Sequence, residues 1–136
     1  MSIKIGSTID VPPLLPGQIV SLPGRGEIFV RHHQHDDPNA PTVLLLHGWT
    51  ASSDVNFFTA YETLSQAYSI IGVDHRGHGR GLRPNRPFSL EDCADDVAAI
   101  ADILGINTFI PVGYSMGGTI AQLIWQRHES RVRGLV

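Results

Sequence analysis

Three short runs of apolar residues divide the chain, and none of them alternates between apolar and polar positions. They are TVLLLHG at 42–48, YSIIGVD at 68–74 and NTFIPVG at 107–113. A strand that is apolar throughout is typical of a parallel sheet covered by helices on both faces. Before them, QIVSLPGRGEIFVRHH at 18–33 places two apolar runs around a turn composition, which predicts a β-hairpin.

Helical spacing fills the intervals between these runs. Phe57, Tyr61 and Leu64 lie at i, i+4 and i+7, which predicts one helix over 54–67. A third predicted helix, from Met116 to about His128, is apolar over much of its surface, and we expect its Trp125 in the core.

The clearest predicted helix begins after Ser89. Ser89 and Asp92 resemble a capping box with Asp in place of Glu, and Gly105 has the place of a C-cap glycine. The acidic residues of this helix are expected on a solvated face, and Cys93 is expected to be a packed thiol. The apolar stripe consists of Leu90, Cys93, Val97, Ile100 and Leu104.

Strands that alternate with helices predict the α/β class, with an antiparallel hairpin followed by parallel strands and flanking helices. Residues 1–17, rich in Pro and Gly, are expected to form an irregular lead-in to an α/β domain over 18–136. The last six residues, RVRGLV at 131–136, begin a further apolar run. We therefore expect the sheet to be truncated near a sixth strand.

Composition and charge limit the partners and the location that we expect for this protein. The chain has 136 residues, 42% of them apolar, and a net charge of −3, which gives no reason to expect nucleic acid or an anionic membrane as a partner. Its one Cys excludes an internal disulfide. We see no secretory signal and no apolar run long enough to span a membrane, and we expect a cytoplasmic protein.

The candidate chemistry lies in the pentapeptide at 113–117, which fits G-x-S-x-G between a predicted strand and a predicted helix. A strand that turns into a helix within one residue forces Ser115 into a strained conformation and exposes its hydroxyl. The flanking positions, Gly113 and Gly117, then tolerate only very small side chains. The helix that begins at Met116 directs free N–H groups toward the site, which favours a developing oxyanion.

Two other glycine patterns compete with this interpretation. Gly113 and Gly118 have phosphate-loop spacing, but Thr119 stands where that motif requires Lys. RGHGRG at 76–81 suggests a dinucleotide fingerprint, but Leu82 stands where its last Gly belongs. We therefore expect no cofactor.

Three motifs, LLLHGWTASS, DHRGHGRG and VGYSMGG, in this order, resemble the α/β-hydrolase superfamily, and the resemblance covers most of the chain from about Gln18. It implies a nucleophile at Ser115 and an oxyanion hole from the N–H groups of Trp49 and Met116. One position departs from the family, which often has Ser where this chain has Gly81. The resemblance gives a structural role to His47, Gly48, Asp74, Arg76, Gly77, Gly79, Gly113 and Gly117.

The family resemblance also implies a catalytic acid and a histidine later in the chain, and we expect both, with the cap domain, beyond Val136. None of the seven histidines stands where the base belongs. HHQH at 32–35 could chelate a metal, but a solvated loop is expected and no metal site is predicted. Trp49 is a candidate for lining an acyl pocket as well as for filling space.

The sequence thus predicts part of a serine hydrolase that cleaves small-molecule carboxylic esters through an acyl-enzyme, inactive or nearly so as an isolated chain. Two other classes stay open: a non-catalytic binding or interaction module, and one half of a two-chain hydrolase. Under either alternative, the truncated sheet edge could bind a partner chain or a second copy of this chain. Among enzymes, C–C hydrolases, cofactor-free haloperoxidases and acyltransferases also stay open.

Overall fold

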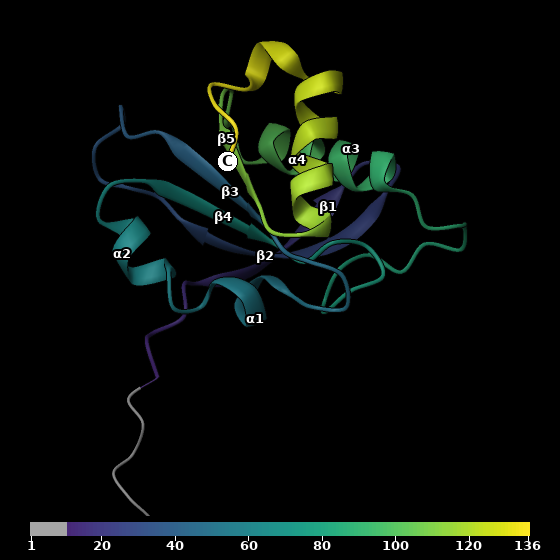
Figure 1. The fold of residues 1–136 in the computed structure, drawn as a ribbon, viewed down its shortest axis with the longest axis horizontal. Coiled ribbons are helices and arrows are strands. Elements are labelled where there is room, and N and C mark those ends of the chain that lie inside the picture. The colour runs from purple at the N-terminus through teal and green to yellow at the C-terminus, as the bar shows by residue number, and fades with distance from the viewer. Residues whose placement is uncertain (1–10) are drawn as a thin grey trace, which may run out of the picture.

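The computed structural model describes residues 11–136 and places a five-stranded sheet between two layers of helices (Figure 1). The strands are β1 (Gly17–Leu22), β2 (Gly26–His33), β3 (Thr42–Leu46), β4 (Ser69–Val73) and β5 (Ile110–Gly113). The helices are α1 (Ser53–Phe57), α2 (Tyr61–Ser65), α3 (Leu90–Ile103), α4 (Met116–Arg127) and the short 3-10 helix η1 (Glu129–Arg131).

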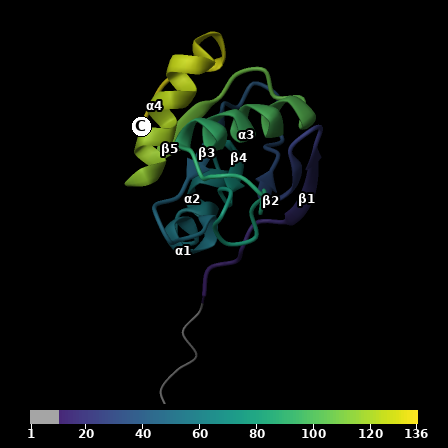
Figure 2. The same ribbon diagram turned by 90° about the vertical axis from the view of Figure 1, so that its right-hand side faces the viewer.

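The strand order β1-β2-β4-β3-β5 confirms the predicted hairpin and the predicted parallel strands. β1 pairs antiparallel with β2, and β2 pairs antiparallel with β4. β3 runs parallel to both of its neighbours, β4 and β5. Helices α3 and α4 cover one face of the sheet, while α1 and α2 cover the other (Figures 1 and 2).

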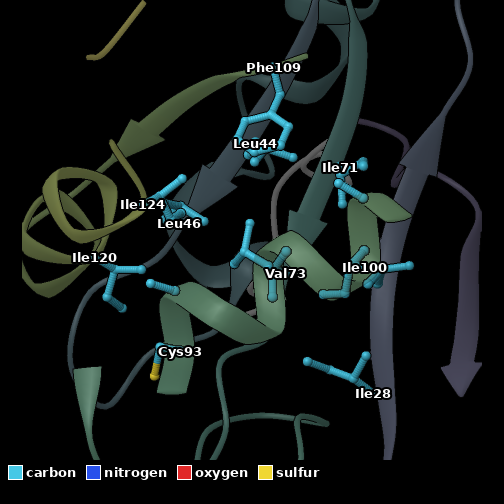
Figure 3. Packing of buried hydrophobic residues seen from close by; sticks show 14 of the residues in the cluster. Ile28, Leu44, Leu46, Ile71, Val73, Cys93, Ile100, Phe109, Ile120 and Ile124 are labelled. Carbon is cyan, nitrogen blue, oxygen red and sulfur yellow. The ribbon is translucent and has the colours of Figure 1, made fainter. Parts of the chain in front are cut away.

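The central strand β3 shows why the apolar runs do not alternate. Leu44 and Leu46 pack into the cluster beneath α3 and α4, and Leu45 packs on the opposite face with Tyr61 of α2. Figure 3 shows the larger cluster, in which side chains from the strands meet those of α3 and α4, Ile100 and Ile124 among them. Both faces of the strand are buried, so its positions from Val43 to Leu46 are all apolar.

Helix α3 begins and ends as the sequence predicts. The Asp92 N–H donates to Ser89 Oγ at 3.1 Å, and Gly105 follows the helix with a φ of 71°. Cys93 is fully buried, and this burial raises the pKa of its thiol to about 12. The packed thiol expected at this position is therefore confirmed.

The single helix predicted over 54–67 is wrong, because the chain forms two short helices there. The Ala60 N–H donates to the Phe57 carbonyl three residues back at 2.8 Å, which tightens the turn between α1 and α2. Tyr61 then directs its hydroxyl back to Ser53 Oγ, 2.8 Å away, and donates to Asp54 at 2.9 Å. These buried polar contacts compensate for the interruption of the helix.

Residues 132–136 run beside β5 and bring the C-terminus next to it (Figure 1). Val132 forms a parallel bridge with Phe109, and the Gly113 N–H donates to the Val136 carbonyl at 2.8 Å. The predicted further apolar run therefore makes backbone contacts to the sheet edge.

The prediction that Trp125 lies in the core is wrong, since half of its surface is exposed. Helix α4 packs on the sheet through Ile120, Ala121 and Ile124. Trp125 falls beside that stripe and is close to the exposed Leu135.

Candidate functional site

Ser115 occupies the sharp turn between β5 and α4. Its backbone has φ 54° and ψ −118°, and among residues 11–136 Thr50 is the other non-glycine residue with a positive φ. The Tyr114 N–H donates to the Leu46 carbonyl at 3.0 Å, which ties the turn to the end of β3. The Ser115 side chain is exposed and makes no capping hydrogen bond to α4. A strained backbone thus presents a free hydroxyl.

The two flanking glycines make this turn possible. A Cβ at Gly113 would overlap the backbone of Gly117, and a Cβ at Gly117 would overlap the Leu46 carbonyl. Both contacts are with backbone atoms, which cannot move aside as a flexible side chain can. Only glycine allows α4 to start this close to β3.

The loop after β3 lies against the same turn. A Cβ at Gly48 would stand 3.4 Å from Ser115 Cβ and 3.2 Å from the Tyr114 ring. The Gly48 N–H donates to Asn56 Oδ1 at 2.8 Å, which fixes the loop to α1. Within residues 11–136, the backbone N–H groups of Trp49 and Met116 have no hydrogen-bond acceptor. One unpaired amide follows Gly48, the loop residue that approaches Ser115, and the other follows Ser115 itself.

His47 holds the base of this loop. Its Nδ1 donates to the Gly48 carbonyl at 2.7 Å and its Nε2 accepts from the His75 N–H at 2.9 Å. Burial lowers the pKa of His47, so the ring is neutral with its proton on Nδ1. It joins the loop after β3 to the loop after β4.

Asp74 braces the loop that follows β4. Its Oδ1 accepts from the Ser53 N–H and its Oδ2 from the Arg80 N–H, both at 2.9 Å. Gly79, with a φ of 46°, leaves no room for a Cβ beside that carboxylate. Gly77 also has a positive φ, 75°. The loop therefore wraps around a fully buried carboxylate.

Gly81, where the family often has Ser, is packed more tightly than the sequence indicates. A Cβ there would overlap the backbone carbonyls of His75 and Asp74. A side chain at this position would therefore require the loop to move.

Arg76 turns away from Ser115 toward α3. Its guanidinium makes two hydrogen bonds of 2.7 Å to Asp96, and Arg25 of the hairpin turn donates to the same carboxylate at 2.6 Å. Asp96 and Arg76 are almost fully buried, so the expectation that the acidic residues of α3 lie on a solvated face is wrong for Asp96. Sequence spacing does not indicate this pairing, since Arg25 and Arg76 lie in two loops far from Asp96 in the sequence.

An open groove of about 450 Å³ adjoins the loop after β3. Its aromatic lining is Trp49, His78 and Phe88, whose ring centres are 5.0 to 5.8 Å apart. Trp49 is 60% exposed and Phe88 is 41% exposed. Sequence reasoning named Trp49 as a candidate wall but missed Phe88, because the intervening loop carries no periodic pattern.

No described histidine serves Ser115. His33 and His35 bond the carbonyls of Ser65 and Gln66, and His128 pairs with Asp95. His47 and His78 bond backbone groups of their own loops, while the ring nitrogens of His75 and the Nε2 of His32 lack partners. Residues 11–136 also contain no group of three or more His, Cys, Asp or Glu able to hold a metal ion.

A parallel sheet between helices, with an exposed serine at φ 54° between a strand and a helix, defines an α/β protein of hydrolase type. The family model described as alpha/beta hydrolase fold matches residues 41–136, and the chain belongs to that family.

Curated relatives agree. AB hydrolase superfamily protein YisY of Bacillus subtilis is 34% identical over 102 residues, which cover 75% of this chain and 37% of that protein. Bifunctional esterase/perhydrolase DCH of Acinetobacter calcoaceticus is 35% identical over 80 residues, which cover 59% of this chain and 29% of that protein. The chain spans about a third of the length of these relatives. Other relatives include proteins named as a non-heme chloroperoxidase and a probable acyltransferase.

Solved structures show the same fold. The enol-lactonase from Burkholderia xenovorans LB400 matches with a TM-score of 0.79 at 25% identity, over 87% of this chain and 45% of that one. A membrane phospholipase A described as a bacterial virulence factor matches with a TM-score of 0.80 at 30% identity. The match covers 89% of this chain and 38% of that one. The described sheet is thus the N-terminal part of an α/β-hydrolase fold. No helix of residues 11–136 is long and apolar enough to cross a membrane.

Proposed function

We propose that Ser115 is the nucleophile of an acyl-transfer reaction on small-molecule carboxylic esters. The observation that carries the proposal is the backbone of Ser115, which is strained at φ 54° and ψ −118° and holds an exposed hydroxyl. Strain of this kind persists only where the surroundings enforce it and is concentrated at functional sites. Gly113 and Gly117 enforce it here.

The amides of Trp49 and Met116 are the proposed oxyanion hole. Ser115 Oγ attacks the ester carbonyl, and the carbonyl oxygen takes the negative charge that these N–H groups stabilise. Met116 N–H also belongs to the first turn of α4, where the helix dipole favours an anion. Collapse of the tetrahedral intermediate releases the alcohol and leaves an acyl group on Ser115, which water then removes.

The reaction also needs a base to take the Ser115 proton and return it to the leaving alcohol. Five of the seven histidines bond other groups, and His32 and His75 make no hydrogen bond to this hydroxyl. We therefore propose that the base and its acid partner come from residues other than 11–136, in the same polypeptide or in a second chain. The 136-residue chain alone is expected to be inactive or nearly so.

The test measures hydrolysis of a short-chain aryl ester by the full-length protein. It compares the Ser115→Ala variant with the Ser130→Ala variant. Ser130 is exposed in η1, so its loss controls for removal of a surface hydroxyl. Ser115→Ala should lower kcat by about 10⁴-fold or more, while Ser130→Ala should match the unaltered protein.

Equal ester hydrolysis by both variants would refute the proposal. Rapid hydrolysis by the purified 136-residue chain would instead refute the need for an outside base. Copurification of a second chain at fixed stoichiometry, with activity only in the complex, would identify that chain as the source of the base.

A further inference from the structure

The groove beside Trp49 has no role in the reaction as proposed above. Its volume of about 450 Å³ falls in the range of small-molecule sites, and its walls are aromatic. Trp49 and Phe88 meet in a T-shaped arrangement with ring centres 5.6 Å apart, and Trp49 meets His78 in the same way at 5.0 Å. These rings hold one another in place and leave apolar faces open to solvent.

Trp49 links the groove to Ser115. Its backbone directly follows Gly48, whose Cα faces the Ser115 side chain, and its indole forms a wall of the groove. Thr50, the next residue, has a φ of 58°, so the backbone on the far side of Trp49 is constrained as well. A substrate group bound in the groove would therefore hold the reacting carbonyl at a fixed position near Ser115.

His78 supplies the polar edge of the groove. Its Nδ1 donates to the Arg76 carbonyl at 3.0 Å. Among the described residues Nε2 has no hydrogen-bond partner. The ring lies tilted against buried His47, with ring centres 5.3 Å apart, and it also contacts Trp49 and Phe88.

We propose that this groove binds an aromatic ring of the ester substrate, so that the proposed reaction prefers aryl-bearing esters over saturated ones of the same size. The inference rests on the proposed function. Offset and edge-to-face contacts with three rings favour a flat π-system beyond the effect of burial alone. A saturated ring of equal volume gains the burial but loses these contacts.

The first experiment measures selectivity in the protein at its encoded length. Benzyl acetate is compared with cyclohexylmethyl acetate, and methyl phenylacetate with methyl cyclohexylacetate, so that the ring lies on the alcohol side or on the acyl side. In one of the two pairs kcat/KM should favour the aromatic ester by about three- to tenfold. Phe88→Ala should bring that ratio close to one, whereas Ile103→Ala, a change at an exposed apolar residue of α3, should keep it.

The second experiment measures binding without catalysis, in the 136-residue chain. The chain has two tryptophans, so Trp125→Phe leaves Trp49 as the single indole reporter. Benzyl alcohol should change Trp49 emission in a saturable way, and cyclohexylmethanol should bind about three- to tenfold more weakly. Phe88→Ala in this background should weaken the binding of benzyl alcohol.

The two proposals fail differently. Ester hydrolysis that depends on Ser115 but shows a ratio near one in both substrate pairs would overturn the aromatic subsite and leave the proposed function standing. Saturable, Phe88-dependent binding of benzyl alcohol in a protein without Ser115-dependent hydrolysis would support the ring site and overturn the proposed function.

Discussion

The carbonyl of Leu46, the last residue of β3, lies directly against the Cα of Gly117 in the first turn of α4. The Leu46 oxygen also accepts a 3.0 Å hydrogen bond from the Tyr114 N–H. One carbonyl therefore fixes both the approach to Ser115 and the start of the helix that follows it. The close contact of strand and helix is what forces the turn at Ser115.

Gly117→Ala should destabilise the fold by about 3 kcal/mol, the upper part of the range for overpacking, because its Cβ would overlap backbone atoms. Gly118→Ala is the matched control, since its nearest non-local atom would lie 3.7 Å from the new Cβ. In a helix the control should gain up to about 1 kcal/mol from the better propensity of Ala. Urea unfolding curves of the two variants check this, and similar midpoints would contradict it.

Asp96→Asn should lower the free energy of unfolding by about 3 kcal/mol, because the buried Arg76 guanidinium loses both hydrogen bonds to Asp96 and keeps only its 3.3 Å ion pair with Asp92. Asp95→Asn, one position earlier, removes a carboxylate from the partly exposed pair with Arg127 and should change stability by less than about 1 kcal/mol. Chemical denaturation at neutral pH compares them. Equal losses would show that the buried pair has no special role.

His75→Leu should reduce the acid sensitivity of the fold. Burial, with His47 and His78 nearby, lowers the pKa of His75 well below 6.5, and both of its ring nitrogens lack a hydrogen-bond partner. Below pH 6.5 the unfolded chain therefore binds a proton that the folded chain excludes, and stability falls as the pH falls. This histidine should contribute about 1.4 kcal/mol per pH unit in that window.

Unfolding free energies measured between about pH 5 and pH 8 test this prediction. In His75→Leu the slope below pH 6.5 should be shallower by that amount, with little change above it. Val55→Ala, an exposed change that removes no titratable group, should keep the original slope. An unchanged slope in His75→Leu would contradict the burial argument.

Ser115→Gly should stabilise the protein by about 1 kcal/mol, because glycine adopts φ 54° without steric conflict. Ser115→Ala keeps the Cβ and therefore keeps the strain, so its melting temperature should stay near that of the unaltered chain. Calorimetry on the two variants separates the backbone effect from loss of the hydroxyl. A lower melting temperature for the Gly variant would show that the turn is unstrained.

Much of the fold could be predicted because its signals are local. The apolar runs that became β3 and β4 do not alternate between apolar and polar positions, so their burial on both faces followed directly. Ser89 and Gly105 marked the ends of α3 through contacts within a few residues. The cytoplasmic location and the roles of the site residues stay predictions.

The errors came from contacts between distant segments. Asp96 looked like a solvated residue until Arg25 and Arg76 met it from two loops. Trp125 looked like a core residue, but the orientation of α4 on the sheet leaves it half exposed. The helix over 54–67 is divided at the turn where the Ala60 N–H donates to the Phe57 carbonyl, and the Tyr61 hydroxyl contacts Ser53 and Asp54 across that turn.

The sequence by itself determined the order of strands and helices, the family, and the serine between two glycines, because these depend on neighbouring residues and on local steric limits. Only the tertiary structure decided that Gly48 lies beside Ser115, that Asp96 is a buried partner of Arg76, and that Trp49, His78 and Phe88 form one groove. Each of these depends on the distance in space between segments that are far apart in the sequence. Chain packing sets that distance, and the periodicity of a sequence does not record it.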